Sequence, residues 1–228
     1  MTRLATVATV IICMLPEQAY AQRPLFASAP GSPVTVGPGS GQVALADIDR
    51  DGHLDMITRH LLSRTVSVSL GNGKGGFTPA PGGDIRLNYQ LGAIALGDVN
   101  NDGIPDLAVT SSDRDSVDVF LGNGKGGFSL APGSPFTASP STIPYTRGIC
   151  VVDINEDGNL DIVTTDGDRN VLSILFGNGR GGFSRGPVVT LALGSDHSGF
   201  AFGDVDGDGH IDVVTASHAE EGFQRRRA

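Results

Sequence analysis

The amino-acid sequence predicts an all-β protein, a partial β-propeller of four-stranded blades, from three observations. A nine-residue acidic window recurs four times, starting at Asp47, Asp98, Asp153 and Asp204, so the spacings are 51, 55 and 51 residues. Short apolar or alternating segments of strand length follow the windows, separated by glycine-rich turns. No segment has helical periodicity, which disfavours helical solenoids. Four-stranded units with a period of about fifty residues are typical of propeller blades.

The chain begins with the features of a secretory signal peptide, residues 1–21. Arg3 supplies the positive charge, residues 4–15 form an apolar run, and Ala19 and Ala21 fit a cleavage site. The apolar run is shorter than the roughly 20 residues that a membrane-spanning helix needs. We therefore expect a secreted protein, extracellular or periplasmic, with no transmembrane segment.

Each repeat begins with a short strand that leads directly into the acidic window. The aligned apolar positions of this strand are Val43, Ile94, Ile149 and Phe200. Cys150 occupies a slot that alanine fills in the other repeats. We expect a packed, inert thiol there, and no intrachain disulfide, because the only other cysteine, Cys13, lies in the signal segment.

Two further strands are expected after each window, and a fourth after a glycine-rich turn. The second strand is predicted at residues 56–58, 107–109, 162–164 and 213–215. The third strand is predicted at residues 66–70, 117–121 and 172–176, and an example of the fourth at residues 187–192.

The turn between the third and fourth strands reads Gly-Asn-Gly-Lys/Arg-Gly-Gly-Phe at residues 71–77, 122–128 and 177–183. Asn-Gly between such segments predicts a hairpin in which both residues take positive φ. The first Gly always lies 24 residues after the first Asp of the window. The turn also matches a nucleotide-binding pattern, but that reading needs a helix after the last Gly, and Pro-containing segments follow instead.

The two ends of the chain break the pattern. Residues 26–36 are expected to form the last strand of a blade whose other strands are missing. Arg225 and Arg227 stand where the third strand of the fourth repeat needs apolar residues, so that repeat is expected to end after its second strand. The prediction is three complete blades, an orphan N-terminal strand and a half blade over residues 22–217, with repeats near 42–92, 93–147, 148–198 and 199–217. Residues 218–228 form a divergent Arg-rich tail.

The acidic windows have the spacing of calcium ligands. Calcium prefers six to eight oxygen ligands, which alternate side chains of one loop can supply. Positions 1, 3, 5 and 9 offer side-chain oxygens, position 7 offers a carbonyl, and Gly at position 6 allows the bend. The predicted ligands are Asp47, Asp49, Asp51, His53 and Asp55; Asp98, Asn100, Asp102, Ile104 and Asp106; Asp153, Asn155, Asp157, Asn159 and Asp161; and Asp204, Asp206, Asp208, His210 and Asp212.

These windows predict up to four Ca²⁺ ions. They are not EF-hands, because position 12 is never acidic and the flanking segments are strands. Solvated Asp-Gly turns without metal are the alternative, but four copies favour calcium, and magnesium is disfavoured because it retains waters. The formal net charge of −9, to which the windows contribute strongly, argues against a nucleic-acid partner.

The window followed by Val-Ser-Val-x-Leu-Gly-Asn-Gly-x-Gly-Gly-Phe resembles the FG-GAP/VCBS repeat family, whose calcium loops also occur in integrin α subunits. The resemblance covers residues 26–217. It implies a secreted propeller, usually of about seven blades, with calcium in the loop that joins the first two strands of a blade. This chain departs from the family in its number of blades.

No catalytic grouping emerges from the sequence. Asp196, His197 and Ser198 are adjacent, and triad members meet through the fold rather than through adjacency. We expect a secreted, non-enzymatic calcium-binding repeat protein that binds or adheres to an extracellular protein or glycan. The alternatives are a propeller scaffold of a carbohydrate-active enzyme, which the absence of Trp disfavours, and a truncated relic of a larger repeat protein. Self-association through unfinished blade edges is a further expectation.

Overall fold

The computed structural model describes residues 28, 32–138, 146–166, 171–190, 197–217 and 223–227. The described residues form strands and turns, and no helix among them is long and apolar enough to cross a membrane. The predicted signal segment, residues 1–21, lies outside the described residues, as do Phe26, Asp196 and His218.

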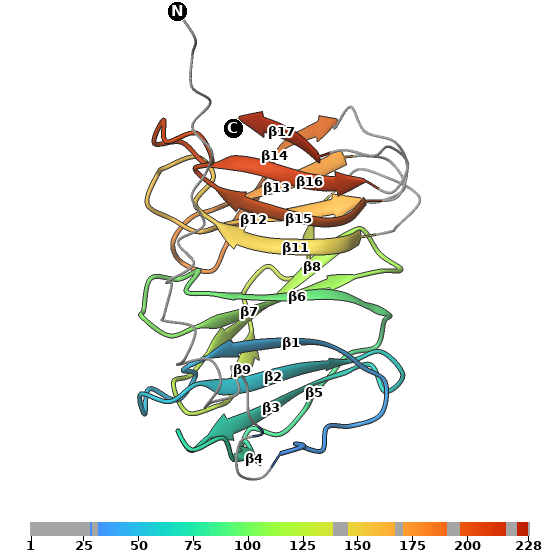
Figure 1. Cartoon of the computed structure of the whole chain (residues 1–228), viewed down its shortest axis with the longest axis vertical. Coiled ribbons are helices and arrows are strands. Elements are labelled where there is room, and N and C mark those ends of the chain that lie inside the picture. The colour runs from blue at the N-terminus through green and yellow to red at the C-terminus, as the bar shows by residue number, and fades with distance from the viewer. Residues whose placement is uncertain are drawn as a thin grey trace, which may run out of the picture.

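The strands follow one another in four groups (Figure 1). The first two groups are β1 (Ser40–Ala46), β2 (Asp55–His60), β3 (Thr65–Gly71), β4 (Phe77–Pro79) and β5 (Ile85–Arg86), then β6 (Leu91–Gly97), β7 (Asp106–Ser111), β8 (Ser116–Gly122), β9 (Phe128–Leu130) and β10 (Phe136–Thr137). The last two are β11 (Thr146–Val152), β12 (Asp161–Asp166), β13 (Val171–Gly177) and β14 (Phe183–Thr190), then β15 (His197–Gly203), β16 (Asp212–Ser217) and β17 (Phe223–Arg227).

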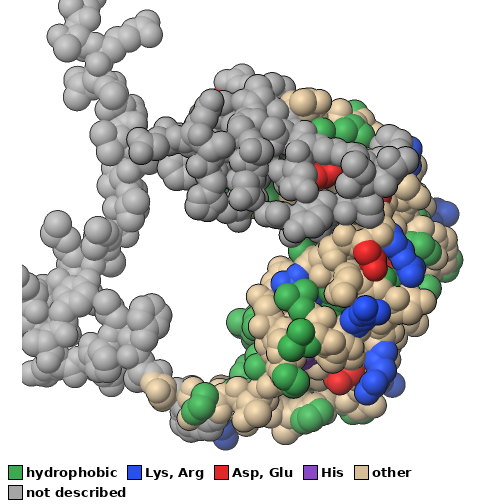
Figure 2. All heavy atoms as spheres, turned by 90° about the vertical axis from the view of Figure 1, so that its right-hand side faces the viewer, with side chains coloured by type: hydrophobic (Ala, Val, Ile, Leu, Met, Phe, Trp, Pro, Cys, Tyr) green, Lys and Arg blue, Asp and Glu red, His purple; other side chains and the backbone are tan. Residues whose placement is uncertain are grey.

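Each group is one antiparallel sheet whose strands pair in sequence order, as the repeat predicts. The fourth strand of the first two sheets is split into two short pieces, so β4 and β5 both pair with β3, and β9 and β10 both pair with β8. The sheets stack face to face along the long axis of the molecule, with β1, β6, β11 and β15 one above another (Figure 1). The space-filling view shows that the described part of the molecule curves around an open side (Figure 2). The fold is therefore the predicted partial propeller.

The hairpin between the third and fourth strands is present, but its predicted geometry is wrong. Gly73 and Gly75 take positive φ, whereas Asn72 does not. The loop has five residues, and the Asn72 side chain closes it by accepting hydrogen bonds from the backbone N–H groups of Lys74 and Gly76, both at 2.9 Å. A side chain that bonds to the nearby backbone replaces the two-residue turn.

Both predicted chain ends also need correction. The fourth sheet does not stop after its second strand, because β17 pairs with β16 in a register that sets Arg226 beside Val213. Strand pairing uses backbone N–H and C=O groups, so polar side chains alone do not prevent it. At the other end, residues 32–36 of the predicted orphan strand are not in a strand. Pro30, Pro33 and Pro38 lack the N–H donors that a ladder requires.

The hydrophobic core lies between successive sheets. One cluster joins the first two sheets, through Ile57, Ile94 and their neighbours, and further clusters join the second sheet to the third and the third to the fourth. The same repeat position has different surroundings in different blades. Ile94 on β6 is 2% exposed because the first sheet covers it, whereas Val43 on β1 is 55% exposed.

We predict that Ile94→Ala lowers the free energy of unfolding by about 2–4 kcal/mol, because it removes buried carbons and leaves a cavity. The matched Val43→Ala variant at the exposed position should cost less than about 0.5 kcal/mol. Urea unfolding of both variants measures the difference. An equal loss of unfolding free energy in both variants would contradict the exposure of Val43. It would indicate that a second copy covers this face of the first blade in solution.

Candidate metal centres

The four acidic windows form the loops between the first and second strands of the four sheets. Position 1 follows directly on the first strand, and position 9 is the first residue of the second strand, as with Asp47 after β1 and Asp55 in β2. All four loops lie at the same end of their sheets, since the order and direction of the strands repeat.

The aspartate at position 9 is fully buried in each window. Asp55, Asp106, Asp161 and Asp212 are at most 1% exposed. One carboxylate oxygen accepts a hydrogen bond from the backbone N–H of position 2, which is 2.7 Å for Ile48 to Asp55 and 2.9 Å for Val99 to Asp106. This bond folds the loop back onto the start of the second strand.

The other carboxylate oxygen of position 9 reaches the third strand. The N–H of Gly71 donates to Asp55 at 2.7 Å, and Gly122 and Gly177 donate to Asp106 and Asp161 at 2.8 Å. A Cβ at Gly71 would overlap the backbone carbonyl of Leu54, so only glycine fits. This contact explains the constant 24-residue spacing, whose cause the sequence alone did not reveal.

The exposed part of each loop is shaped by short aspartate-to-backbone bonds. Asp47 accepts the N–H of Gly52 at 3.0 Å, and Asp51 accepts the N–H of His53 at 2.8 Å. Gly52 has a φ of 88°, as predicted for position 6. The sequence did not reveal that position 4 is also left-handed, and its residues are Arg50, Asn101, Glu156 and Gly207.

The carboxylates converge in the first and fourth loops. Oxygens of Asp47, Asp49 and Asp55 lie within 4.8 Å of one another, and so do oxygens of Asp204, Asp206 and Asp208. Asp47 Oδ1 is buried and has no hydrogen-bond partner. A buried, unpaired carboxylate oxygen is costly unless a cation coordinates it, so the first loop fits a hard divalent cation.

The second and third loops differ because asparagine stands at position 3. The amide of Asn100 donates to Asp102 at 2.9 Å, and that of Asn155 donates to Asp157 at 3.0 Å. The side-chain oxygen of each asparagine accepts the backbone N–H of position 5 at 3.1 Å, as the aspartate at position 3 also does in the first and fourth loops. The feature of these two loops is therefore a hydrogen bond between the side chains at positions 3 and 5.

Electrostatics in the loops favour a positive partner. Burial raises the pKa of Asp106 to about 6, against the hydrogen bonds from Gly122 and Val99 that lower it. Burial likewise raises the pKa values of Asp161 and Asp49. A nearby cation would favour the charged form and oppose these shifts.

Successive loops are joined to one another through position 4. Arg50 Nη2 donates to the Asp102 carbonyl at 2.6 Å. Asn101 Nδ2 donates to Asn159 Oδ1 at 3.1 Å. His210 Nδ1 lies 2.7 Å from Glu156 Oε1, and this carboxylate raises the pKa of His210. Position 7 was predicted to supply only its backbone carbonyl as a calcium ligand, but its side chain also contacts the neighbouring blade in Asn159 and His210.

The remaining polar residues do not assemble a catalytic group within the described residues. His60 is buried on β2, where its Nδ1 lies 3.1 Å from Ser40 Oγ. Cys150 is part-buried, and burial raises the pKa of its thiol. A neutral thiol is a weak nucleophile, as expected for a packed cysteine.

Comparisons with known proteins agree with this architecture. The model of the FG-GAP-like repeat matches residues 61–109, 98–164 and 153–215. No curated protein sequence matches the chain.

Three solved structures share the fold. BBS1N, solved in complex with ARL6DN, has a TM-score of 0.55 at 13% identity, covering 83% of this chain and 55% of its own. A lectin of Agrocybe aegerita that recognises non-reducing terminal N-acetylglucosamine has a TM-score of 0.53 at 21% identity, covering 82% and 52%. The Tc holotoxin pore of Photorhabdus luminescens has a TM-score of 0.52 at 20% identity, covering 81% and 9%. The chain thus spans about half of the first two proteins and a small part of the third.

We predict that Asp106→Asn destabilises the protein even without metal, by about 2–3 kcal/mol. The carboxylate accepts the N–H groups of Val99 and Gly122, and the NH₂ group of asparagine would face one of these donors and leave it unpaired. Asp102→Asn is the matched control, since its exposed side chain keeps an acceptor for the Ile104 N–H, and it should cost less than about 1 kcal/mol. Urea unfolding in EDTA measures both. An Asp106→Asn variant as stable as the parent would refute the structural role of position 9.

Proposed function

Because the chain belongs to the family of FG-GAP-like repeat proteins, we propose that it is a secreted, non-enzymatic calcium-binding module that binds an extracellular glycan. The observation that carries the calcium part is the first loop, where oxygens of Asp47, Asp49 and Asp55 lie within 4.8 Å of one another and Asp47 Oδ1 is buried without a hydrogen-bond partner. An extracellular protein is the alternative partner.

The chain's own residues supply an oxygen set suited to calcium rather than to magnesium or a transition metal. Carboxylates and carbonyls are hard ligands, and no His or Cys side chain joins the clusters among the described residues. The proposed ligands in each loop are the residues at positions 1, 3, 5, 7 and 9. The first and last loops carry aspartate at positions 1, 3, 5 and 9, whereas the other two have asparagine at position 3, so we expect the first and last loops to bind most tightly.

Calcium in a loop would stabilise both a blade and its contact with the next. The ion would neutralise aspartates that otherwise repel one another near the buried position 9. It would also fix position 4, from which Arg50, Asn101 and Glu156 reach the following loop. A rigid row of blades presents a binding surface without losing conformational entropy on binding.

The glycan part of the proposal has one support, and the secreted part has another. The Agrocybe aegerita lectin, which recognises a saccharide, has the same fold. Extracellular calcium modules work at dissociation constants near 10⁻⁴–10⁻³ M, in line with the proposed signal peptide at residues 1–21. We place no catalytic residue, because the described side chains offer no nucleophile with a base and an orienting partner.

We predict that calcium raises the melting temperature. At a hundredfold excess over the dissociation constant each site contributes about 2.7 kcal/mol, or roughly 5–10 °C for a chain of this size. Differential scanning calorimetry in EDTA, Ca²⁺ and Mg²⁺ measures it, and Mg²⁺ should have a smaller effect.

The matched variants for this experiment are Asp47→Asn in the first loop and Asp84→Asn on an exposed turn. The first should reduce the calcium-dependent shift, and the second should leave it unchanged. A melting temperature that does not respond to calcium would remove calcium from the proposal.

We predict that the calcium-loaded protein binds saccharides on a glycan array and releases no sugar from them. Binding that disappears in EDTA would link the two parts of the proposal. Release of reducing ends from any bound glycan would instead support the carbohydrate-active enzyme, and no binding to any glycan would leave the protein partner.

A further inference from the structure

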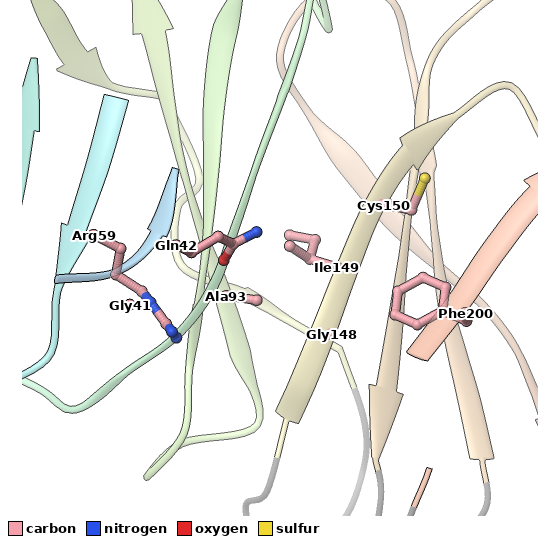
Figure 3. A pocket seen from close by; sticks show the side chains of 8 residues that line it. All are labelled: Gly41, Gln42, Arg59, Ala93, Gly148, Ile149, Cys150 and Phe200. Carbon is pink, nitrogen blue, oxygen red and sulfur yellow. The ribbon is translucent and has the colours of Figure 1, made fainter. Parts of the chain in front are cut away.

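A cavity of about 350 Å³ lies where the first strands of successive blades meet (Figure 3). Arg59 and Gln42 come from the first blade, Ala93 from the second, Gly148 from the third, and Phe200 from the fourth. Gln42 pairs with Arg59 near one end of β1 and β2, while Ala46 pairs with Asp55 at the other. The cavity therefore lies toward the end of the sheets opposite the acidic loops.

Arg59 carries a charge that none of the described residues balances. Its side chain is part-buried, and its Nε is buried without a hydrogen-bond partner. No hydrogen bond or ion pair joins it to any other described residue. Burial lowers the pKa of its guanidinium, and no carboxylate opposes that shift. An unpaired, partly desolvated cation is unfavourable unless a ligand supplies the anion.

The fold does not require an arginine at this place. The equivalent positions in the other repeats are Thr110, Thr165 and Ala216. In the second blade the Thr110 hydroxyl accepts the N–H of Ala93 at 2.7 Å, which satisfies the backbone where the first strand shifts register. Arg59 instead extends along Gly41, where a Cβ would lie 2.9 Å from its Nη2.

The rest of the cavity is lined by small residues and by side chains held in place by their neighbours. The Gln42 amide is fixed across the first two blades, since it donates to the Ile94 carbonyl and accepts the Ile94 N–H, both at 2.9 Å. Its equivalents are the small residues Ala93, Gly148 and Gly199. The Phe200 ring lies over Gly148, where a Cβ would overlap it, and it forms the wall opposite Arg59 (Figure 3).

We propose that this cavity binds a carboxylate-bearing sugar, with Arg59 pairing the carboxylate and Phe200 contacting the apolar face of the ring. The planar guanidinium matches a carboxylate in a bidentate pair. One cation balances one unit of negative charge, so the cavity suits a ligand with a single carboxylate. The saccharide part of this inference rests on the proposed glycan-binding function, whereas the anion part rests on Arg59 alone.

The test is an NMR titration of the full chain in calcium with sodium D-glucuronate and with D-glucose, in buffer free of carboxylates. Wild-type protein should bind glucuronate about tenfold or more tightly than glucose, the difference expected of a charged hydrogen bond. Arg59→Thr, which installs the residue of the second and third blades, should remove this preference. Arg86→Thr, at an exposed arginine, should keep it.

The fold of Arg59→Thr is checked by its calcium-dependent melting shift, which should match the parent because the loops lie at the other end of the sheets. Three outcomes would overturn the proposal. They are equal affinity for the two sugars, glucuronate binding by Arg59→Thr as tight as in the parent, and displacement of glucuronate by equimolar sulfate. Glucuronate binding without any glycan-array signal would contradict the glycan-binding function but keep the anion site. Binding of neutral glycans alone would support the glycan-binding function but contradict the anion site.

Discussion

The structure depends on one repeated interaction, the buried carboxylate at position 9 of each window. In the first three blades it accepts one N–H from its own loop and one from the glycine that ends the third strand. Hydrogen bonds to a charged group contribute about 1.5–3 kcal/mol, more than neutral ones. A single side chain thereby ties the first, second and third strands of a blade together, and it fixes the acidic loop between the first two.

This arrangement separates two roles within one acidic motif. Position 9 is bound by backbone N–H groups of its own loop and of the third strand, whereas the aspartates at positions 1 and 5 accept N–H groups within the loop itself. Because position 4 reaches the next blade, the conformation of one loop bears on its neighbour. A ligand that orders the loops would therefore act on the row of blades rather than on each blade alone.

The sequence predicted the repeat, the order of the strands and the acidic loops because these features depend on local patterns. Alternation in residues 66–70 and the bend at Gly52 need no information from elsewhere in the chain. The reason for Gly71 could not be predicted, since it lies in a contact with Leu54 and Asp55 across the sheet. The third strand of the last blade was missed because its pairing is through the backbone, whereas the argument against it came from side chains.

Residues that recur in every repeat have a structural role, whereas residues that differ in one repeat are candidates for a function. Residues that recur at every repeat position, such as the position 9 aspartates, are explained by the blade. Arg59 and Gln42 depart from the small residues at their equivalent positions, and no neighbouring group in the first blade requires a cation there. In a repeat protein the same position can be compared from blade to blade, and Arg59 is the one charged residue at its position, without a partner among the described residues. This difference between blades is the basis of the proposed ligand site.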